Sequence, residues 1–534
     1  MMNKNKLFHL TRQAGFLRKS SLALAVVLVV LGVGVSFLNT GRLDAYQDVF
    51  APEYVGEYDE ELDGFLLEES NQNAVEAAVA AILKADAPFH EKLLDIQYLL
   101  YYAPPSNAIE IPAAGSLSST NHAIAVAFVE ACSKPKDAAA LQPLELLAVA
   151  EPPAPDANFA LALAFENRKN DLAAITALYR EIDGHDSAHA RERLVTTYLD
   201  LEKYDAIEAL GADPKYKEFI TPYVVQEIAL DRMDWPVIIK TQIPAAYEGT
   251  SMAMLALALF SGLIWALILL RFNGSLSIKA AVVKLAVPAL LLGALSTHGT
   301  LLVIYWQEHQ LGFVMGNEMA QQLIYCIGGI GLREELMKLL FFVPLIPFLL
   351  KRTDLEILTI AGLVGLGFAI EENINYFEHS AGLSALGRFA TANFLHIALT
   401  AMCGLTLTRA VAHRAENVLQ ALVTFGMAVM IHGLYDAFIM VPALEDYSFL
   451  TYTVFVLMGY QYFGWLRHLR DEWKDPVSIT SIFTLGIILL TGLSFGLFAW
   501  QAGPANAFQA VGNEVIGVAI ILLLFYREIP ETIQ

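Results

Sequence analysis

From residue 251 onward, the chain consists almost entirely of long apolar runs separated by short charged segments. A membrane-crossing α-helix needs about 20 apolar residues, and most of these runs have that length. Within lipid, only helices and closed barrels satisfy every backbone polar group, and runs of this length favour helices. We therefore predict nine membrane spans in this region, near residues 251–271, 280–306, 313–350, 356–377, 388–411, 417–440, 448–466, 478–500 and 508–526.

Another apolar run, residues 21–38, lies near the N-terminus behind several basic residues. It is longer than the roughly 7–15 residues of a secretory signal, and no small-residue cleavage site follows it. We predict an uncleaved anchor within residues 1–40, which brings the expected total to about ten spans. The basic residues after residue 250 fall in alternate loops, so both termini are predicted to be cytoplasmic. The Gly-rich stretch 328–331 predicts a broken or re-entrant helix within 313–350.

The composition of the chain combines 56% hydrophobic residues with a net charge of -21. Residues 41–250 hold 36 Asp and Glu against 15 Lys and Arg, which accounts for the whole excess. A block with this net negative charge repels nucleic acid and anionic lipid surfaces. No nucleic-acid partner is therefore expected. Of the three cysteines, only Cys132 lies in this block, so no disulfide is expected within it.

The acidic block shows helical periodicity and a weak repeat of about 32 residues. The repeated pattern begins at Asn170, at Lys203 and at Met233. We predict that residues 41–250 form an extracytoplasmic helical domain of tetratricopeptide-like type, with an irregular helical bundle as the alternative. The predicted fold class is therefore all-α, with a polytopic membrane part and this second domain.

Charged and polar residues interrupt four consecutive predicted spans. Each ionisable group at the centre of a bilayer costs about 2.5–3.5 kcal/mol on insertion scales. At 1.5 Å per helical residue, Glu335 lies roughly 22 Å from the cytoplasmic end of its span, and the other groups reach a similar level. We predict one polar site in the outer half of the membrane, formed by Glu334, Glu335, Lys338, Glu372, Asn373, His396, His432 and Asp436.

Several of these groups also have a purely structural interpretation. Glu334 or Glu335 can pair with Lys338 one turn away, and we expect at least one such pair. His432 and Asp436 can form a helix-stabilising pair at i and i+4. Polar groups of four spans would then reach the same depth in the membrane by coincidence, which is less plausible than a shared functional cavity.

Three further positions were weighed in the same way. Glu371 and Glu372 lie near a helix end, where either side chain can face water, and His396 alone can be a packed, hydrogen-bonded histidine. Arg388 and Arg409 lie at predicted helix ends, where their side chains are expected to reach the membrane surface.

The ordered set of motifs resembles the PrsW family of intramembrane proteases. The resemblance covers about residues 320–440, within a predicted protease domain at 251–534. It implies a protein of the bacterial inner membrane that cleaves a membrane-anchored protein, such as an anti-sigma factor, near the extracytoplasmic face. The PrsW family is in turn similar to the type II CAAX prenyl endopeptidases, in which a glutamate and a histidine activate water. The motifs are Glu334-Glu335-x-x-Lys338, Phe368-x-x-x-Glu372-Asn373, Arg388 to Gly404 around His396, and His432-Gly-Leu-Tyr-Asp436.

The resemblance implies a catalytic role for each of these residues. Peptide hydrolysis needs a base, a proton donor for the leaving amine and a stabiliser of the oxyanion. Glu335 or Glu334 is expected to be the base, and His396 to hold or polarise the water. His432, oriented by Asp436, is expected to donate a proton or to stabilise the oxyanion, and Asn373 is a candidate oxyanion donor. Glu372 is expected to share the site or to orient the water, and Lys338 to tune the glutamate pair.

A zinc-dependent mechanism is the alternative to this metal-free one. Glu335, Glu372, His396 and His432 can ligate Zn²⁺ and leave a position open for water. Because the helical HExxH signature is missing, we place the metal-free mechanism first, with no cofactor.

Two other classes of function use the same features. A transporter or proton relay would also need intramembrane Glu and His, although no inverted repeat is evident. A non-catalytic scaffold would use residues 41–250 to bind a protein partner, since helical repeats often present a concave binding face. The expected partners are the lipid bilayer, a membrane-anchored substrate and a protein partner of the acidic domain.

Overall fold

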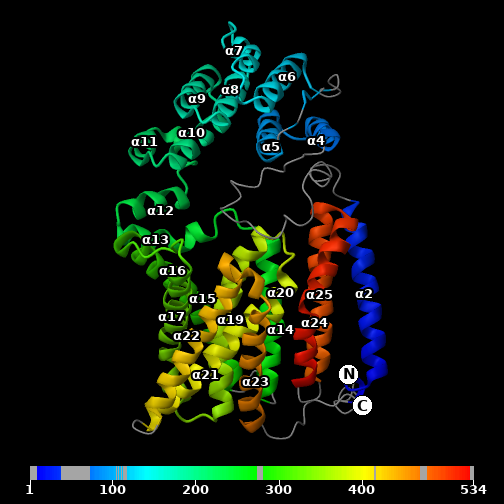
Figure 1. Ribbon diagram of the computed structural model, residues 1–534, viewed down its shortest axis with the longest axis vertical. Helices are drawn as coiled ribbons and strands as arrows, with labels where there is room; N and C mark the ends of the chain where they lie inside the picture. Colours follow the sequence, from blue (N-terminus) through cyan, green and yellow to red (C-terminus); the bar gives the residue numbers. More distant parts are fainter. Residues whose placement is uncertain are drawn as a thin grey trace. The chain divides into compact units, whose positions relative to one another are not determined.

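The computed structural model describes helices throughout and no strand among the residues it covers (Figure 1). The predicted all-helical fold class is therefore confirmed. The predicted border at residue 40 and basic residues such as Lys279 and Arg414 lie outside the described residues. The described residues are 9–37, 72–103, 105, 107–109, 111, 117–273, 281–413, 417–469 and 478–528.

The chain divides into two compact units. The first, called the membrane unit, is drawn from Met1–Ser36, Gly249–Trp500 and Pro504–Gln534. The second, called the acidic unit, is drawn from Phe37–Glu248 and Gln501–Gly503.

Eight helical segments of the membrane unit are long and apolar enough to cross a bilayer, so the chain is an integral membrane protein. Two of the predicted spans are not among them. The segments comprise α2 (Ala14–Ser36), α14 (Met252–Phe272), α15 (Ala281–Leu311), α19 (Asp354–His379), α20 (Ala385–Ala390) together with α21 (Ala392–His413), α22 (Val418–Met440), α24 (Ile479–Ala502) and α25 (Pro504–Glu528).

One of the two remaining predicted spans, 313–350, is a helix that changes type along its length. At the Gly-rich stretch 328–331, where a break in the helix was predicted, the structure has a π-helical segment. The chain stays helical on both sides of this segment. The other, 448–466, corresponds to α23 (Leu450–Leu469). A total of ten spans stays a prediction. The path through 313–350 consists of α16 (Met319–Ile324), η5 (Tyr325–Gly331), α17 (Leu332–Phe342), η6 (Val343–Leu345) and α18 (Ile346–Leu349).

Helix α19 is the centre of the membrane unit and packs against α14, α15 and α21. At its first residue, Asp354 accepts a hydrogen bond of 2.5 Å from Arg409 near the end of α21. One turn further, Thr359 accepts a hydrogen bond from Asn273, which follows α14. The ends of α14 and α21 therefore lie beside the start of α19. This agrees with the alternate placement of basic loops along the sequence.

Two glycines allow the helices that carry the predicted site to approach closely. A Cβ atom at Gly365 of α19 would lie 2.2 Å from the carbonyl oxygen of His396 on α21. A Cβ atom at Gly433 of α22 would lie 2.5 Å from Cα of Ile327 in η5. Real side chains do not tolerate such distances to backbone atoms. Small residues at these crossings therefore set the spacing of the site.

We predict that Gly365→Ala destabilises the membrane unit, because its methyl group would push α21 away from α19 at His396. Overpacking of this kind costs about 1–3 kcal/mol. Thermal unfolding of the full chain in detergent measures the effect. The matched control is Gly464→Ala on α23, where a Cβ atom would meet nothing within 4 Å. Equal melting temperatures for the two variants would contradict the prediction.

The acidic unit contains three successive helical hairpins that share one turn geometry. The turn residues Lys169, Glu202 and Met233 have φ of 55°, 53° and 53° and lie about 32 residues apart. In each turn, the next residue donates its amide to the carbonyl five residues earlier, as Asn170 does to Phe165 at 3.0 Å. The sequence repeat thus corresponds to a structural repeat, while its tetratricopeptide assignment stays a prediction. The hairpins are α8 (Ala157–Glu166) with α9 (Asp171–His185), α10 (Ala188–Asp200) with α11 (Tyr204–Leu210), and α12 (Pro222–Asp231) with α13 (Trp235–Ala246).

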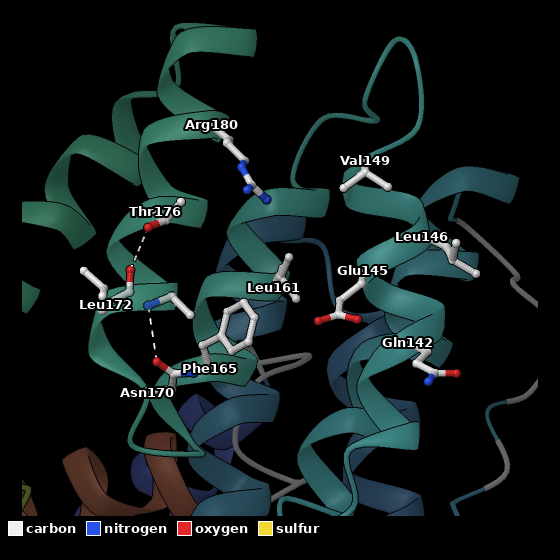
Figure 2. Close-up of a pocket in the computed structure, with 11 residues that line it drawn as sticks. Gln142, Glu145, Leu146, Val149, Leu161, Phe165, Asn170, Leu172, Thr176 and Arg180 are labelled. Carbon is white, nitrogen blue, oxygen red and sulfur yellow. Dashed lines mark hydrogen bonds between the residues drawn. The ribbon is translucent and has the colours of Figure 1, made fainter.

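Helices before these hairpins share one hydrophobic core with α8 to α12. A groove of about 730 Å³ lies in this unit. Figure 2 shows α7 (Gln142–Ala148) on one side of it, α9 on the other and α8 at its floor. Leu161 and Phe165 form the floor, and Glu145 and Arg180 line opposite walls. The preceding helices are α4 (Gln72–Lys84), α5 (Phe89–Tyr102), α6 (Ser119–Ser133), η3 (Ala139–Leu141) and α7 (Gln142–Ala148).

Candidate active site

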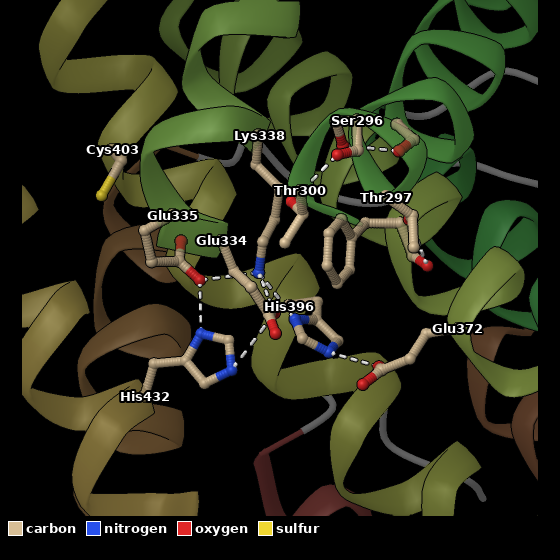
Figure 3. Close-up of polar contacts among 12 residues, drawn as sticks. Ser296, Thr297, Thr300, Glu334, Glu335, Lys338, Glu372, His396, Cys403 and His432 are labelled. Carbon is tan, nitrogen blue, oxygen red and sulfur yellow. Dashed lines mark hydrogen bonds and ion pairs between the residues drawn. The ribbon is translucent and has the colours of Figure 1, made fainter. Parts of the chain in front are cut away.

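The π-helical segment η5 leads directly into α17, the helix that carries the glutamate pair. A π-helical segment is often found at functional sites, because it shifts the register of the side chains that follow. Glu335 and Lys338 are three residues apart on α17 and both are fully buried. Figure 3 shows their side chains directed toward α21 and α22, which carry the two histidines.

Lys338 is the central cation of the site. Its Nζ donates to Glu335 Oε1 at 2.7 Å and to His396 Nδ1 at 2.8 Å. It also lies 3.6 Å from Glu334 Oε2 and 4.3 Å from the centre of the Phe368 ring. The expected pairing of Lys338 with a glutamate of its own helix is therefore present, and it is made chiefly with Glu335.

These contacts determine the hydrogen position on His396. An ammonium group has no acceptor, so Lys338 donates and His396 Nδ1 accepts. His396 Nε2 therefore carries the hydrogen and donates to Glu372 Oε2 at 3.0 Å. A carboxylate thus orients this imidazole, and its lone pair points to the position that the lysine ammonium now fills.

His432 on α22 is oriented in the same way by another glutamate. Its Nδ1 lies 2.8 Å from Glu335 Oε1, a carboxylate oxygen that can only accept. His432 Nδ1 therefore donates to Glu335, and His432 Nε2 lies 3.5 Å from both Glu334 Oε2 and Asp436 Oδ2. The two imidazole rings meet edge to face, with centroids 5.2 Å apart.

The site is closed on one side and open on the other. Glu335 and Lys338 have no exposed side-chain surface. Asp436 is 18% exposed and Glu372 is 23% exposed. A substrate would therefore approach from the side of Glu372 and Asp436.

All eight residues predicted for the site are joined by the contacts of this cluster, although Asn373 lies at its edge. Asn373 is fully buried, and its amide nitrogen donates to Asn393 Oδ1 at 2.7 Å. Its amide oxygen accepts a hydrogen bond from Arg388. Asn373 is thus linked to the other site residues only through Arg388, and its role as an oxyanion donor stays a prediction.

Two further residues beside the site were not predicted for it. His298 of α15 pairs with Glu371 Oε1 at 3.1 Å. Arg388, which was expected to reach the membrane surface, instead turns inward to Glu372 at 2.6 Å. The position of Arg388 within the third motif was the available signal, but its partner lies on another helix.

The donor groups of the cluster fit a divalent metal ion. Ligand atoms of Glu334, His396 and His432 all lie within 4.8 Å of one another. Two imidazoles and one glutamate are a known ligand set for catalytic zinc. Glu334 Oε2 is buried and has no hydrogen-bond partner among the described residues. His396 must give up one of its two present contacts to bind a metal.

The charge balance of the cluster supports the same fit. Among the described residues, the four carboxylates of Glu334, Glu335, Glu372 and Asp436 form their ion pairs with two permanent cations, Lys338 and Arg388, and with histidines. An excess of two negative charges within a membrane is costly unless protons or a cation balance it. The ligand set differs from the predicted one, because Glu335 and Glu372 orient the two histidines.

A helical membrane protein with an embedded cluster of carboxylates, imidazoles and a lysine has the groups of an intramembrane hydrolase. Residues 282–461 match the model of the PrsW family, described as intramembrane metalloproteases. The predicted resemblance is thereby confirmed. The match extends from α15 into α23 and includes all four motifs. Neither the curated proteins nor the solved structures contain a match to this chain.

We predict that Lys338→Met destabilises the membrane unit strongly, because Glu335 would lose its buried partner. Breaking a buried ion pair costs about 3–5 kcal/mol. The double variant Lys338→Met/Glu335→Leu should recover much of this loss. Unfolding of the full chain in detergent measures both effects.

The control for this prediction is Arg352→Met, which removes an exposed pair with Glu356 at 4.0 Å. A surface pair of this kind contributes about 0–1 kcal/mol. If Lys338→Met is no more destabilising than this control, the central role of Lys338 is wrong.

Proposed function

We propose that the membrane unit is an endopeptidase that hydrolyses peptide bonds of membrane-anchored proteins, such as an anti-sigma factor, near the extracytoplasmic face. The family match supports proteolysis within the membrane. The observation that carries the proposal is the convergence of Glu334, His396 and His432 from three helices. The predicted depth of these groups supports the extracytoplasmic side.

Of the two chemistries that the sequence left open, we propose the metal-dependent one. Each histidine gives one N–H to a glutamate, as metal-binding histidines do, and its other ring nitrogen would bind the metal. Glu334, His396 and His432 would hold Zn²⁺. When bound, zinc supplies a Lewis acid and lowers the pKa of water for attack on the scissile carbonyl.

The remaining steps fall to side chains of this chain. Asp436 Oδ2 is buried without a hydrogen-bond partner among the described residues and lies 3.5 Å from His432 Nε2. It is placed to accept a proton from the attacking water and to pass it to the leaving amine. Glu335 and Glu372 hold the two imidazoles, and Lys338 neutralises Glu335 at the closed side of the site.

We predict that Glu334→Gln lowers kcat for cleavage of a single-span substrate in liposomes, by about 10²–10⁴-fold. The amide keeps the volume of the side chain but loses the negative charge. The control is Glu445→Gln, an exposed glutamate of the membrane unit, which should cleave at the wild-type rate. Full activity of Glu334→Gln would overturn the proposed function.

Metal analysis of the same preparations separates the two chemistries. Wild-type protein should contain zinc, lose both zinc and activity on chelation, and regain both when zinc is added. His432→Gln should contain little zinc. Cleavage that survives exhaustive chelation would reject the metal-dependent form and favour the metal-free mechanism, with Glu335 or Glu334 as the base.

A further inference from the structure

Arg388 of the short helix α20 is held in place by three residues of α19. Its Nε donates to Asn373 Oδ1 at 2.5 Å, and its Nη2 donates to Glu372 Oε2 at 2.6 Å. The guanidinium carbon lies 3.6 Å from the centre of the Tyr376 ring. A planar guanidinium can satisfy two acceptors and stack on an aromatic ring at once, which a lysine cannot do.

The hydrogen bonds behind Arg388 fix its orientation. Asn373 donates to Asn393 Oδ1 at 2.7 Å, and Asn393 in turn donates to Ser261 Oγ at 2.9 Å. The side chains of Asn373, Asn393 and Ser261 are fully buried. These hydrogen bonds therefore link α14, α21 and α19. They fix the amide oxygen of Asn373, which accepts from the guanidinium of Arg388.

One carboxylate oxygen of Glu372 accepts hydrogen bonds from both Arg388 and His396. Glu372 Oε2 accepts from Arg388 Nη2 at 2.6 Å and from His396 Nε2 at 3.0 Å. The position of Glu372 thus depends on Arg388, and the hydrogen on His396 depends on Glu372. A carboxylate without the guanidinium would be free to turn toward the exposed side of the site.

We propose that Arg388 is a positioning residue for the hydrolytic site. It holds Glu372 so that His396 keeps its hydrogen on Nε2 and its lone pair on Nδ1. This inference rests on the proposed function for its catalytic consequence, but not for its effect on His396. Partners that orient a metal-binding histidine typically change activity or metal affinity by 10–100-fold when they are altered.

The test compares Arg388→Lys with Arg409→Lys in the full chain. Arg409 of α21 pairs with Asp354 at 2.5 Å at the first residue of α19, whereas Arg388 of α20 pairs with Glu372 in the last part of α19. Arg388→Lys keeps the charge but loses the two-pronged donor. It should lower kcat and zinc affinity by about 10–100-fold with little change in KM. Arg409→Lys should keep wild-type values of all three.

Two further readouts separate positioning from a general loss of structure. Guanidinium ion should restore part of the activity of Arg388→Ala. Nitrogen NMR of histidine-labelled protein, assigned with His396→Gln, should show the hydrogen on Nε2 in the wild type and a changed pattern in Arg388→Ala.

Each outcome decides one of the two proposals. If the wild type cleaves substrate and Arg388→Lys matches it in kcat and zinc affinity, the positioning role is wrong. The same holds if Arg388→Ala leaves the His396 signals unchanged. If the wild type cleaves nothing, the proposed function fails, and the NMR signals still decide the role of Arg388.

Discussion

The buried contact between Lys338 and Glu335 is the interaction on which the rest of the membrane unit depends. Two opposite charges lie 2.7 Å apart with no exposed surface, in a part of the protein where water is excluded. Neither group can be solvated there, so each must be satisfied by protein atoms. Lys338 also binds His396, and Glu335 also binds His432. One ion pair therefore joins α17 to α21 and α22.

The same constraint explains why the helices pack as they do. Charged side chains can be shared among helices only where the backbones come close, and Gly365 and Gly433 allow two of these approaches. The described carboxylates of the cluster outnumber its lysine and arginine, so protons or a cation must balance part of their charge. Structural stability and reactivity thus arise from the same buried charges.

Much of this site could be predicted from sequence, because charges in apolar spans are rare and costly. The motif order predicted the family, and the i, i+3 spacing of Glu335 and Lys338 predicted their pairing. The inward turn of Arg388 could not be predicted, because its partner Glu372 lies on another helix. The assignment of Glu335 and Glu372 as orienting groups, with Glu334 beside the histidines, likewise depends on rotamers and helix rotation.

In the acidic unit, the sequence repeat predicted helical hairpins, and the shared turn at Lys169, Glu202 and Met233 accounts for its period. The groove between α7 and α9 arises from packing between hairpins and has no motif in the sequence. The division of the chain at residues 40 and 250, an extracytoplasmic position of the acidic unit and its binding of a protein partner stay predictions.

The central claim is that the buried cluster hydrolyses a peptide bond with water. The most direct measurement is cleavage of a single-span substrate by purified protein in liposomes prepared in ¹⁸O-labelled water, followed by mass spectrometry of the products. The account predicts one ¹⁸O atom in each newly formed carboxyl terminus from the wild type, and no such product from His396→Gln/His432→Gln. Products without ¹⁸O, or the same labelled product from the double variant, would contradict it.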